Sequence, residues 1–293
     1  MNERFRQFLR AGEQAGSRFR MSVPQRLPMG VGGNAIGSRA GRSLEFLDYR
    51  AYQPGDDLRH LDWNAYARSD RLTVKLFREE VNPHVDLLID GSASMDLPDT
   101  RKAEAVLGLA ALFARAAANA GFTWRSWLAG EGCCPIGNGN GAPTSWENIA
   151  FTWPRDLEAS FRRLPPPWKP RGIRIVLTDL LWPGDPSAAL WPIVSGSALT
   201  LLVQVLAATD RDGPEIGPFR LLDVETQEMR EVLIDDGARS RYREAFERHH
   251  LSWSQTCRRL QTVFTSFTAE SLLLNWNLTD LLSIDILRPE ATR

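Results

Sequence analysis

The sequence VDLLIDGSASM occupies residues 85–95 and joins a buried-strand pattern to a run of oxygen-bearing side chains. Its first part is a short apolar run that begins at Val85 and closes at Ile89, and both of these residues are β-branched. Such a run is too short for a good helix and favours a strand buried in a parallel sheet. Asp90 follows directly, so we expect a carboxylate at the carboxyl end of a strand, where open α/β sheets bind ligands.

Three hard oxygen donors follow this strand at a spacing of two residues: Asp90, Ser92 and Ser94. Alternate residues of an extended or looping segment can point the same way, so the three side chains could converge on one point. One carboxylate and two hydroxyls suit Mg²⁺ or Mn²⁺ better than Zn²⁺. The same pattern is also typical of an Asp that caps the next helix, followed by two serines in an ordinary turn.

A second acid has the same relation to a strand. Asp179 closes the apolar run RIVLTD at residues 174–179, and neighbouring parallel strands bring their carboxyl ends together. Asp90 and Asp179 could therefore flank one ion, with the two serines as direct ligands. Two close carboxylates repel each other, so the pairing needs a positive partner, which favours a metal site over a simple turn.

The composition is that of a folded, near-neutral protein. The chain has 293 residues, a net charge of -1 and 43% hydrophobic residues, enough for one large domain or two small ones. Nothing in this charge balance indicates a nucleic-acid partner. We find no apolar run of about 18 residues that would span a membrane and no signal-peptide core, so we expect a cytoplasmic protein. Cys133, Cys134 and Cys257 are expected to be buried free thiols.

Strands and helices alternate along most of the chain. The expected strands are residues 85–90, 122–128, 133–136 (an edge strand), 173–178, 199–206 and 263–267, with a hairpin at 219–223 and 229–234. The expected helices are residues 1–20, 101–120, 156–164, 186–194, 238–260 and 270–282. This alternation predicts a mainly parallel sheet with helices on both faces. Residues 85–90, 173–178 and 199–206 should be its neighbouring interior strands.

Two other stretches lie upstream of residue 85. The glycine-rich segment at residues 29–43 lacks the Gly-Lys-Ser/Thr ending of a phosphate-binding loop and is predicted to be a surface loop. Residues 44–80 are predicted to form a subdomain packed beside the main domain, with residues 72–77 as a strand. Its charged residues should pair with one another or at the junction. They include Arg50, Asp56, Asp57, Arg59 and Asp62.

DGSASM at a strand end, with a later strand-end Asp, resembles the metal-ion-dependent adhesion site of von Willebrand factor A domains. The segment LEFLDYRAYQPGDDLRHLDWNAYARSDRLTVKLFREE at residues 44–80 resembles the bacterial domain-of-unknown-function-58 family. The resemblance is close over residues 37–95. It implies an N-terminal arm at 1–43, a family-signature subdomain containing β-structure at 44–82, and a doubly wound von Willebrand factor A-like domain at 83–293.

The resemblance also implies a set of metal ligands. Asp90, Ser92 and Ser94 match the first metal motif and Asp179 the last. A loop Thr should stand between them, and Thr152 is the candidate, although the usual Gly-Thr-Asp context is absent; Asp156 is the second candidate. The implied ion is Mg²⁺ or Mn²⁺, weakly held or absent if the Thr is missing. Its sixth position would accept a carboxylate from a partner protein.

Members of the resembled family are typically partnered with MoxR-type AAA+ ATPases in chaperone-like maturation of protein complexes. The resemblance therefore implies a non-enzymatic adaptor whose partners are such an ATPase and a client complex. The alternative is a Mg²⁺-dependent hydrolase that uses Asp90 as nucleophile or metal ligand. A phosphoryl-transfer aspartate is usually followed two residues later by a second acid. Ser92 stands at that position, which disfavours the hydrolase.

Overall fold

The computed structural model describes residues 3–23, 44–51, 62–69, 71–79, 83–224 and 226–290. The chain divides into two compact units. The smaller is Val31–Asn82, and the larger combines Met1–Gly30 with Pro83–Arg293. No helix in these described ranges is both long and apolar enough to cross a membrane.

The smaller unit holds an antiparallel pair of strands. β2 (Leu44–Ala51) pairs with β3 (Thr73–Glu79), which confirms the strand predicted at residues 72–77. The short helix α2 (Trp63–Ser69) begins after Asp62, whose carboxylate accepts the N–H of Ala65 at 3.1 Å. The glycine-rich segment at 29–43, the residues Asp56, Asp57 and Arg59, and the side chain of Arg50 lie outside the described residues. The ion pairs expected there therefore stay a prediction.

The larger unit is built on one six-stranded sheet with the strand order β11-β8-β7-β4-β5-β6. The strands are β4 (His84–Asp90), β5 (Thr123–Ala129), β6 (Cys133–Ile136), β7 (Ile173–Thr178), β8 (Leu199–Leu206) and β11 (Val263–Thr268). All neighbours are parallel except β6, which runs antiparallel to β5 at the edge. The predicted α/β class is confirmed, and so is the placement of β4, β7 and β8 as adjacent interior strands.

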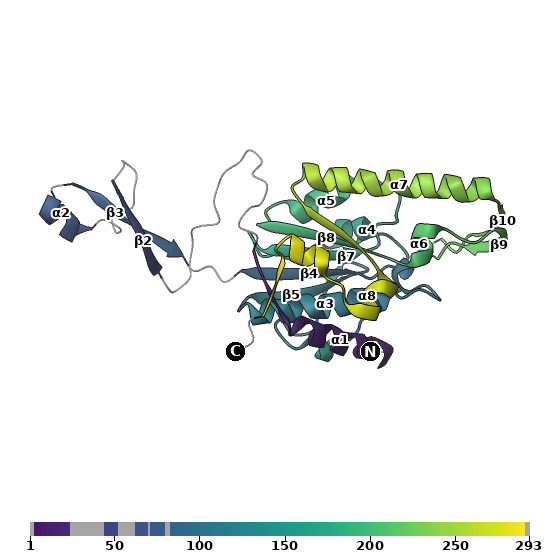
Figure 1. The fold of residues 1–293 in the computed structure, drawn as a ribbon, viewed down its shortest axis with the longest axis horizontal. Helices are drawn as coiled ribbons and strands as arrows, with labels where there is room; N and C mark the ends of the chain where they lie inside the picture. Colours follow the sequence, from purple (N-terminus) through teal and green to yellow (C-terminus); the bar gives the residue numbers. More distant parts are fainter. Residues whose placement is uncertain are drawn as a thin grey trace. The chain divides into compact units, whose positions relative to one another are not determined.

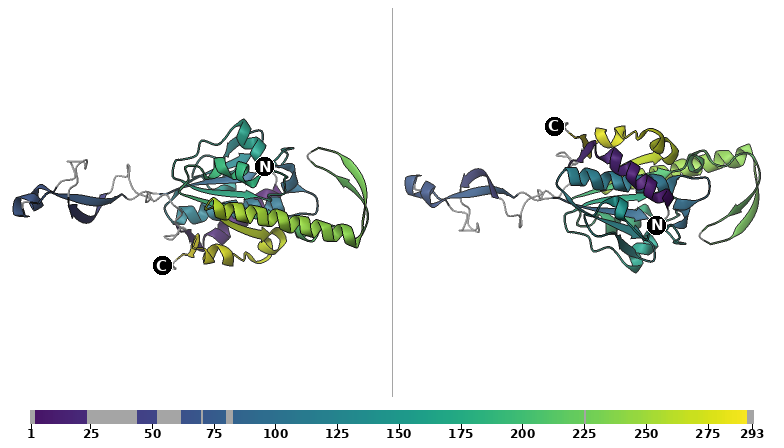
Figure 2. Two further views of the ribbon diagram at one scale, coloured as in Figure 1. Left: turned by 90° about the horizontal axis from the view of Figure 1, so that it is seen from above. Right: turned by 90° about the horizontal axis from the view of Figure 1, so that it is seen from below.

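Helices cover both faces of this sheet (Figures 1 and 2). On one face lie α1 (Glu3–Gly16), α3 (Lys102–Asn119) and α8 (Ala269–Asn275), and on the other lie α4 (Leu157–Arg163), α5 (Pro186–Val194) and α7 (Asp236–Arg259). The alternation of side chains along β4 builds both cores. Leu87 and Ile89 join the cluster that contains α3, and Leu88 joins the cluster that contains Trp253 of α7.

Shorter elements complete the larger unit. β1 (Phe19–Met21) pairs with β12 (Leu287–Pro289), and β9 (Gly217–Leu222) pairs with β10 (Met229–Ile234) as the predicted hairpin. The 3₁₀ turns η2 (Ala93–Asp96) and η3 (Pro143–Ser145) and the short helices α6 (Ala208–Asp212) and α9 (Thr279–Ser283) lie in connections. The sequence patterns did not reveal α6, which carries part of the site described below.

Three expectations about this unit were wrong. The helix predicted at residues 1–20 ends at Gly16, and Phe19–Met21 forms the strand β1 instead. The final helix predicted at 270–282 is interrupted at Trp276, which has a left-handed conformation with φ of 51°. Asn275 accepts the N–H of Asn277 at 3.0 Å, and Asn277 accepts that of Thr279 at 3.1 Å, so side-chain turns replace the helix between α8 and α9. The three thiols are free, but Cys134 is exposed because it alternates with buried Cys133 along the edge strand β6.

The helices α1 and α3 approach each other at glycines. A Cβ atom on Gly12 of α1 would lie 2.0 Å from the carbonyl oxygen of Gly108 in α3. This contact is between backbones, so neither partner can rotate away. The position of α1 against α3 therefore depends on a site, Gly12, that tolerates no side chain.

Gly12→Ala should destabilise the protein by about 1–3 kcal/mol, because the added methyl group forces two helices apart. Gly130→Ala is the control, since a Cβ there would meet nothing within 4 Å. Urea unfolding of the three proteins measures the difference. Equal stability of Gly12→Ala and wild type would mean that α1 does not pack on α3 in this register.

Candidate functional site

The DGSAS loop leaves β4 at the carboxyl edge of the sheet and is held on both sides. The Gly91 N–H donates to the carbonyl of Ala129 at 2.9 Å, and a Cβ on Gly91 would lie 2.5 Å from that oxygen, so a glycine is required there. On the other side Ser92 forms a β-bridge with Trp153. The Ala93 N–H donates to the Trp153 carbonyl at 2.8 Å, and the Trp153 N–H donates to the Gly91 carbonyl at 3.1 Å.

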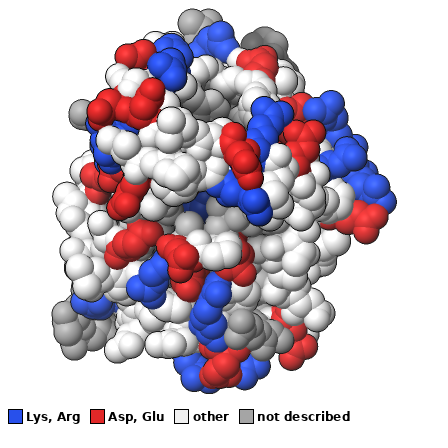
Figure 3. All heavy atoms as spheres, turned by 90° about the vertical axis from the view of Figure 1, so that its right-hand side faces the viewer, with Lys and Arg blue, Asp and Glu red and all other residues white. Residues whose placement is uncertain are grey.

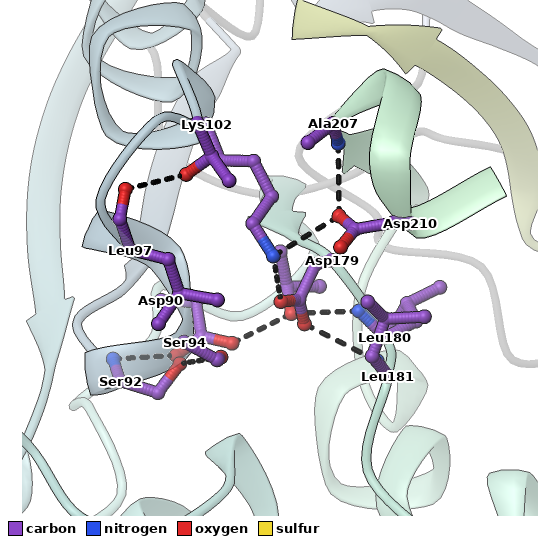
Figure 4. Close-up of polar contacts among 12 residues, drawn as sticks. Asp90, Ser92, Ser94, Leu97, Lys102, Asp179, Leu180, Leu181, Ala207 and Asp210 are labelled. Carbon is purple, nitrogen blue, oxygen red and sulfur yellow. Dashed lines mark hydrogen bonds and ion pairs between the residues drawn. The ribbon is translucent and has the colours of Figure 1, made fainter. Parts of the chain in front are cut away.

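Asp90 is buried, and both of its carboxylate oxygens have donors. Thr178, at the end of the adjacent strand β7, donates its hydroxyl to Oδ2 at 2.6 Å, and the Ser92 N–H donates to Oδ1 at 3.0 Å. The hydroxyls of Ser92 and Ser94 lie 3.0 Å apart and hydrogen-bond to each other (Figure 4). The loop is therefore closed by its own hydrogen bonds, with Ser94 half-buried at its outer side.

The environment of Asp90 opposes its ionisation. Desolvation by burial is the largest cause and the negative charge of Asp179 the second, and together they raise the pKa of Asp90 to about 6. The hydrogen bonds from Thr178 and Ser92 favour the carboxylate and offset only part of this effect. Asp90 thus carries a proton more readily than an ordinary aspartate.

Lys102, the first residue of α3, extends its side chain into the same cluster (Figure 4). Its ammonium nitrogen Nζ lies 2.9 Å from Oδ2 of Asp179 and 3.1 Å from Oδ2 of Asp210. The residue is only 1% exposed. Burial alone would lower the pKa of Lys102, but attraction to Asp179 and Asp210 and their hydrogen bonds outweigh it and raise the pKa, so the ammonium form is held.

Each acid that faces Lys102 is positioned by its own loop. The second oxygen of Asp179, Oδ1, accepts the N–H of Leu181 at 3.2 Å. Oδ2 of Asp210 also accepts the N–H of Ala207 at 2.8 Å, which closes the first turn of α6. These bonds orient the two carboxylates before any ligand arrives.

The structure brings together four of the residues that the sequence singled out: Asp90, Ser92, Ser94 and Asp179. The two candidates for the loop ligand have other roles. The side chain of Thr152 is exposed, and Asp156 is the N-cap of α4, where its Oδ1 accepts the N–H of Ala159 at 2.8 Å. Three members of the cluster were not anticipated, namely Lys102, Thr178 and Asp210.

As arranged, these residues do not fit a divalent metal ion. The oxygens of Asp90 are occupied by Thr178 and Ser92, and those of Asp179 by Lys102 and Leu181. Mg²⁺ needs near-octahedral oxygen ligands at roughly 2.0–2.1 Å and gives up its water reluctantly. Within the described ranges, no group of three or more His, Cys, Asp or Glu side chains is arranged to hold a metal ion. The site instead contains a positive charge supplied by the chain itself.

The same burial argues against Asp90 as a nucleophile. Its side chain is 1% exposed and both oxygens accept hydrogen bonds, so a substrate phosphorus or carbonyl carbon has no approach to either oxygen without a rearrangement. A phosphatase screen in Mg²⁺ tests this directly.

A pocket lined by arginines lies beside the DGSAS loop. We call it the arginine pocket; it has a volume of about 880 Å³ and is lined by Trp153, Pro154, Arg155, Asp156, Ala159, Arg162, Arg163 and Thr226. Arg162 pairs with Glu158 at 2.8 Å and Arg163 pairs with Glu131, both at the surface. Arg155 has no ion-pair partner in the part of the chain that the structure describes.

Trp153 connects the arginine pocket to the DGSAS loop. It lines the pocket, and it forms a β-bridge with Ser92 of the loop. Its indole N–H has no acceptor among the described residues.

Figure 3 shows the face of the molecule that carries α6 and the β9–β10 hairpin. Acidic and basic side chains alternate there around a hollow, so the face is mixed in charge rather than of one sign.

The comparisons with known proteins identify a family through one family model, and no name among the matches states an activity. A family model described as "Protein of unknown function DUF58" matches residues 48–252. Uncharacterized protein Rv1480 of Mycobacterium tuberculosis and uncharacterized protein Mb1516 of Mycobacterium bovis are each 27% identical over 250 residues, which cover 81% of this chain and 78% of each relative.

One solved structure also matches. The crystal structure of conserved hypothetical protein BatB from Bacteroides thetaiotaomicron is 10% identical, with a TM-score of 0.33, over 69% of this chain and 99% of that chain. A likeness this weak carries no argument about fold or function. The architecture therefore rests on the strand order and register described above.

Proposed function

The chain belongs to the DUF58 family, and we propose that it is a non-enzymatic adaptor that binds an acidic segment of a partner protein at the carboxyl edge of its sheet. The observation that carries this proposal is the arginine pocket, which is joined through Trp153 to the loop that contains Ser92 and Ser94. Guanidinium groups bind carboxylates with paired, directional hydrogen bonds. Arg155 is the residue best placed to do so, since its charge is not already paired with a described acid.

We also propose that the larger unit is of the von Willebrand factor A type. Asp90 at the end of β4, Ser92 and Ser94 in the loop that follows, and Asp179 after β7 lie at one edge of the sheet, in the order that the resemblance implies. In such a domain a bound metal ion grips the partner carboxylate. Here the arginines supply the positive charge for that contact, because the carboxylates at the loop are already occupied.

The proposed partners are a MoxR-type AAA+ ATPase and a client complex, and the proposed process is chaperone-like maturation of that complex. Membership of the DUF58 family is what supports the pairing of this chain with a MoxR-type ATPase. Isothermal titration of the full chain with a purified MoxR-type ATPase from the same organism tests it. Heat of binding that is lost in Arg155→Glu supports both the partner and the surface, whereas an absence of binding counts against this partner and leaves the acidic-segment test below to decide the surface.

Arg155→Glu should weaken binding of an acidic peptide by tenfold or more, because it replaces an attraction with a repulsion in the lining of the pocket. The probe is a fluorescent peptide that contains several Asp and Glu residues, measured by anisotropy at low salt in EDTA. The same peptide with Asn and Gln in place of the acids should bind at least tenfold more weakly to wild type.

Arg243→Glu is the matched control, since Arg243 is exposed on α7 and does not line the pocket. It makes the same change in net charge and should leave peptide binding nearly unchanged. Equal losses in both variants would show that only the overall charge matters, and the proposal would fail. Equal binding of the acidic and the amide peptides would also contradict it.

A further inference from the structure

Lys102 stands where a lysine is hard to explain by the helix alone. It is the first residue of α3, and the amide N–H groups exposed at a helix start disfavour a positive charge there. Its side chain is among the largest that are fully buried, although lysine is almost never buried without a partner. The chain has only three lysines among 35 basic residues, at positions 75, 102 and 169. The contacts of its ammonium group must account for its position.

These contacts come from parts of the chain that are far apart in sequence. Asp179 follows β7 and Asp210 lies in α6, and one oxygen of each is within about a hydrogen-bond length of Nζ, at 2.9 and 3.1 Å. The ammonium is a compact point charge with several donors, so it can bond to both carboxylates at once. It therefore lies between Asp179, which follows a strand, and Asp210 in α6, two acids whose mutual repulsion demands a cation.

We infer that the Lys102 ammonium is the resident cation of this site and that the protein functions there without a divalent metal ion. An incoming ion would have to share Asp179 with a buried ammonium group and would be repelled by it. It would also have to displace Thr178 and the Ser92 N–H from Asp90. The inference concerns the cation alone and holds whichever partner the arginine pocket binds.

Wild-type melting temperature should be the same in EDTA and in millimolar Mg²⁺. Lys102→Met keeps the length of the side chain and removes its charge, so it leaves the acids facing one another without a cation. We expect this variant to melt below wild type in EDTA and to gain roughly 5 °C in Mg²⁺, because the emptied position becomes a binding site. Thermal unfolding monitored by circular dichroism measures both effects.

Lys169→Met is the matched control, because the same substitution is made at an exposed lysine. It should behave as wild type in both buffers. Titration with Mn²⁺ followed by electron paramagnetic resonance gives a second readout, in which wild type should bind no ion at the site and Lys102→Met should bind one. If Lys102→Met does not fold, the wild-type Mn²⁺ titration decides alone.

Two outcomes would overturn the inference. The first is a clear Mg²⁺ stabilisation of wild type, or stoichiometric Mn²⁺ binding by it, that disappears in Asp90→Asn. The second is that neither wild type nor Lys102→Met is stabilised by Mg²⁺ or binds Mn²⁺. Lys102 would then not occupy a position that a metal ion can take. Neither result would by itself refute the adaptor proposal, because the peptide measurements are made in EDTA.

Discussion

Asp90→Asn should be more stable than wild type at pH 7 by about 3 kcal/mol, and the two proteins should be similar near pH 4. Asparagine keeps the size of the side chain and can accept the Ser92 N–H while its amide donates to the Thr178 hydroxyl. It removes a buried charge that faces Asp179. Urea unfolding from pH 4 to pH 7.5, with EDTA throughout, measures the difference.

The pH range in which Asp90→Asn and wild type differ in stability follows from the raised pKa of Asp90. The pKa of Asp90 rises from 3.8 to about 6 on folding, first because of burial and then because of Asp179. The folded protein thus holds this proton more tightly than the unfolded chain. Its contribution to stability is fully present below the unfolded pKa and is lost as the pH rises through about 6. Asp90→Asn has no such group and should not show this loss.

Asp212→Asn serves as the control for Asp90→Asn, because Asp212 is exposed at the end of α6. It should follow the wild-type pH profile. Identical profiles for wild type and Asp90→Asn would mean that Asp90 is ionised in the folded protein at an ordinary pKa. In that case the hydrogen bonds from Thr178 and Ser92 would fully offset its burial.

The meeting of Asp90 and Asp179 at the carboxyl edge of the sheet could be predicted from the sequence. It depends on local apolar patterns and on a general topological rule for parallel strands. The apolar runs before Asp90 and Asp179 identify two buried strands, and parallel neighbours bring their ends together. The need for a positive partner also followed from the two acids. The sequence-based hypothesis chose a metal ion to meet it, because the pattern of acid and hydroxyls carries no sign of a distant lysine.

Lys102 and Asp210 escaped prediction for different reasons. Lys102 opens a helix rich in Ala and Leu, where a lysine ordinarily marks a solvated position; its burial depends on tertiary contacts. Asp210 lies in α6, a helix of five residues, which is too short to give a periodic signal. Thr152 was proposed from the resemblance, and the prolines near it left the loop's register open; the structure leaves its side chain at the surface.

Asp179→Asn should destabilise the protein by roughly 3 kcal/mol, because it leaves the buried Lys102 ammonium with one charged partner instead of two. This loss of stability is at the lower end of what breaking a buried ion pair usually costs. Asp210 still pairs with Lys102, and the repulsion between Asp179 and Asp90 is relieved. In the double variant Lys102→Met/Asp179→Asn the unpaired charge is absent. The double variant should therefore be more stable than the sum of the single effects predicts, with a coupling on the order of 2 kcal/mol.

The pair Arg162 and Glu158 on α4 provides the matched cycle, because it is an ion pair four residues apart at the surface. Solvent screens that pair, so its coupling should not exceed about 0.5 kcal/mol. Chemical unfolding at pH 7 in EDTA gives both couplings. If the effects at Lys102 and Asp179 are simply additive, the ammonium and the carboxylate do not act on each other in the folded protein. The strand-end acids would then need another source of positive charge.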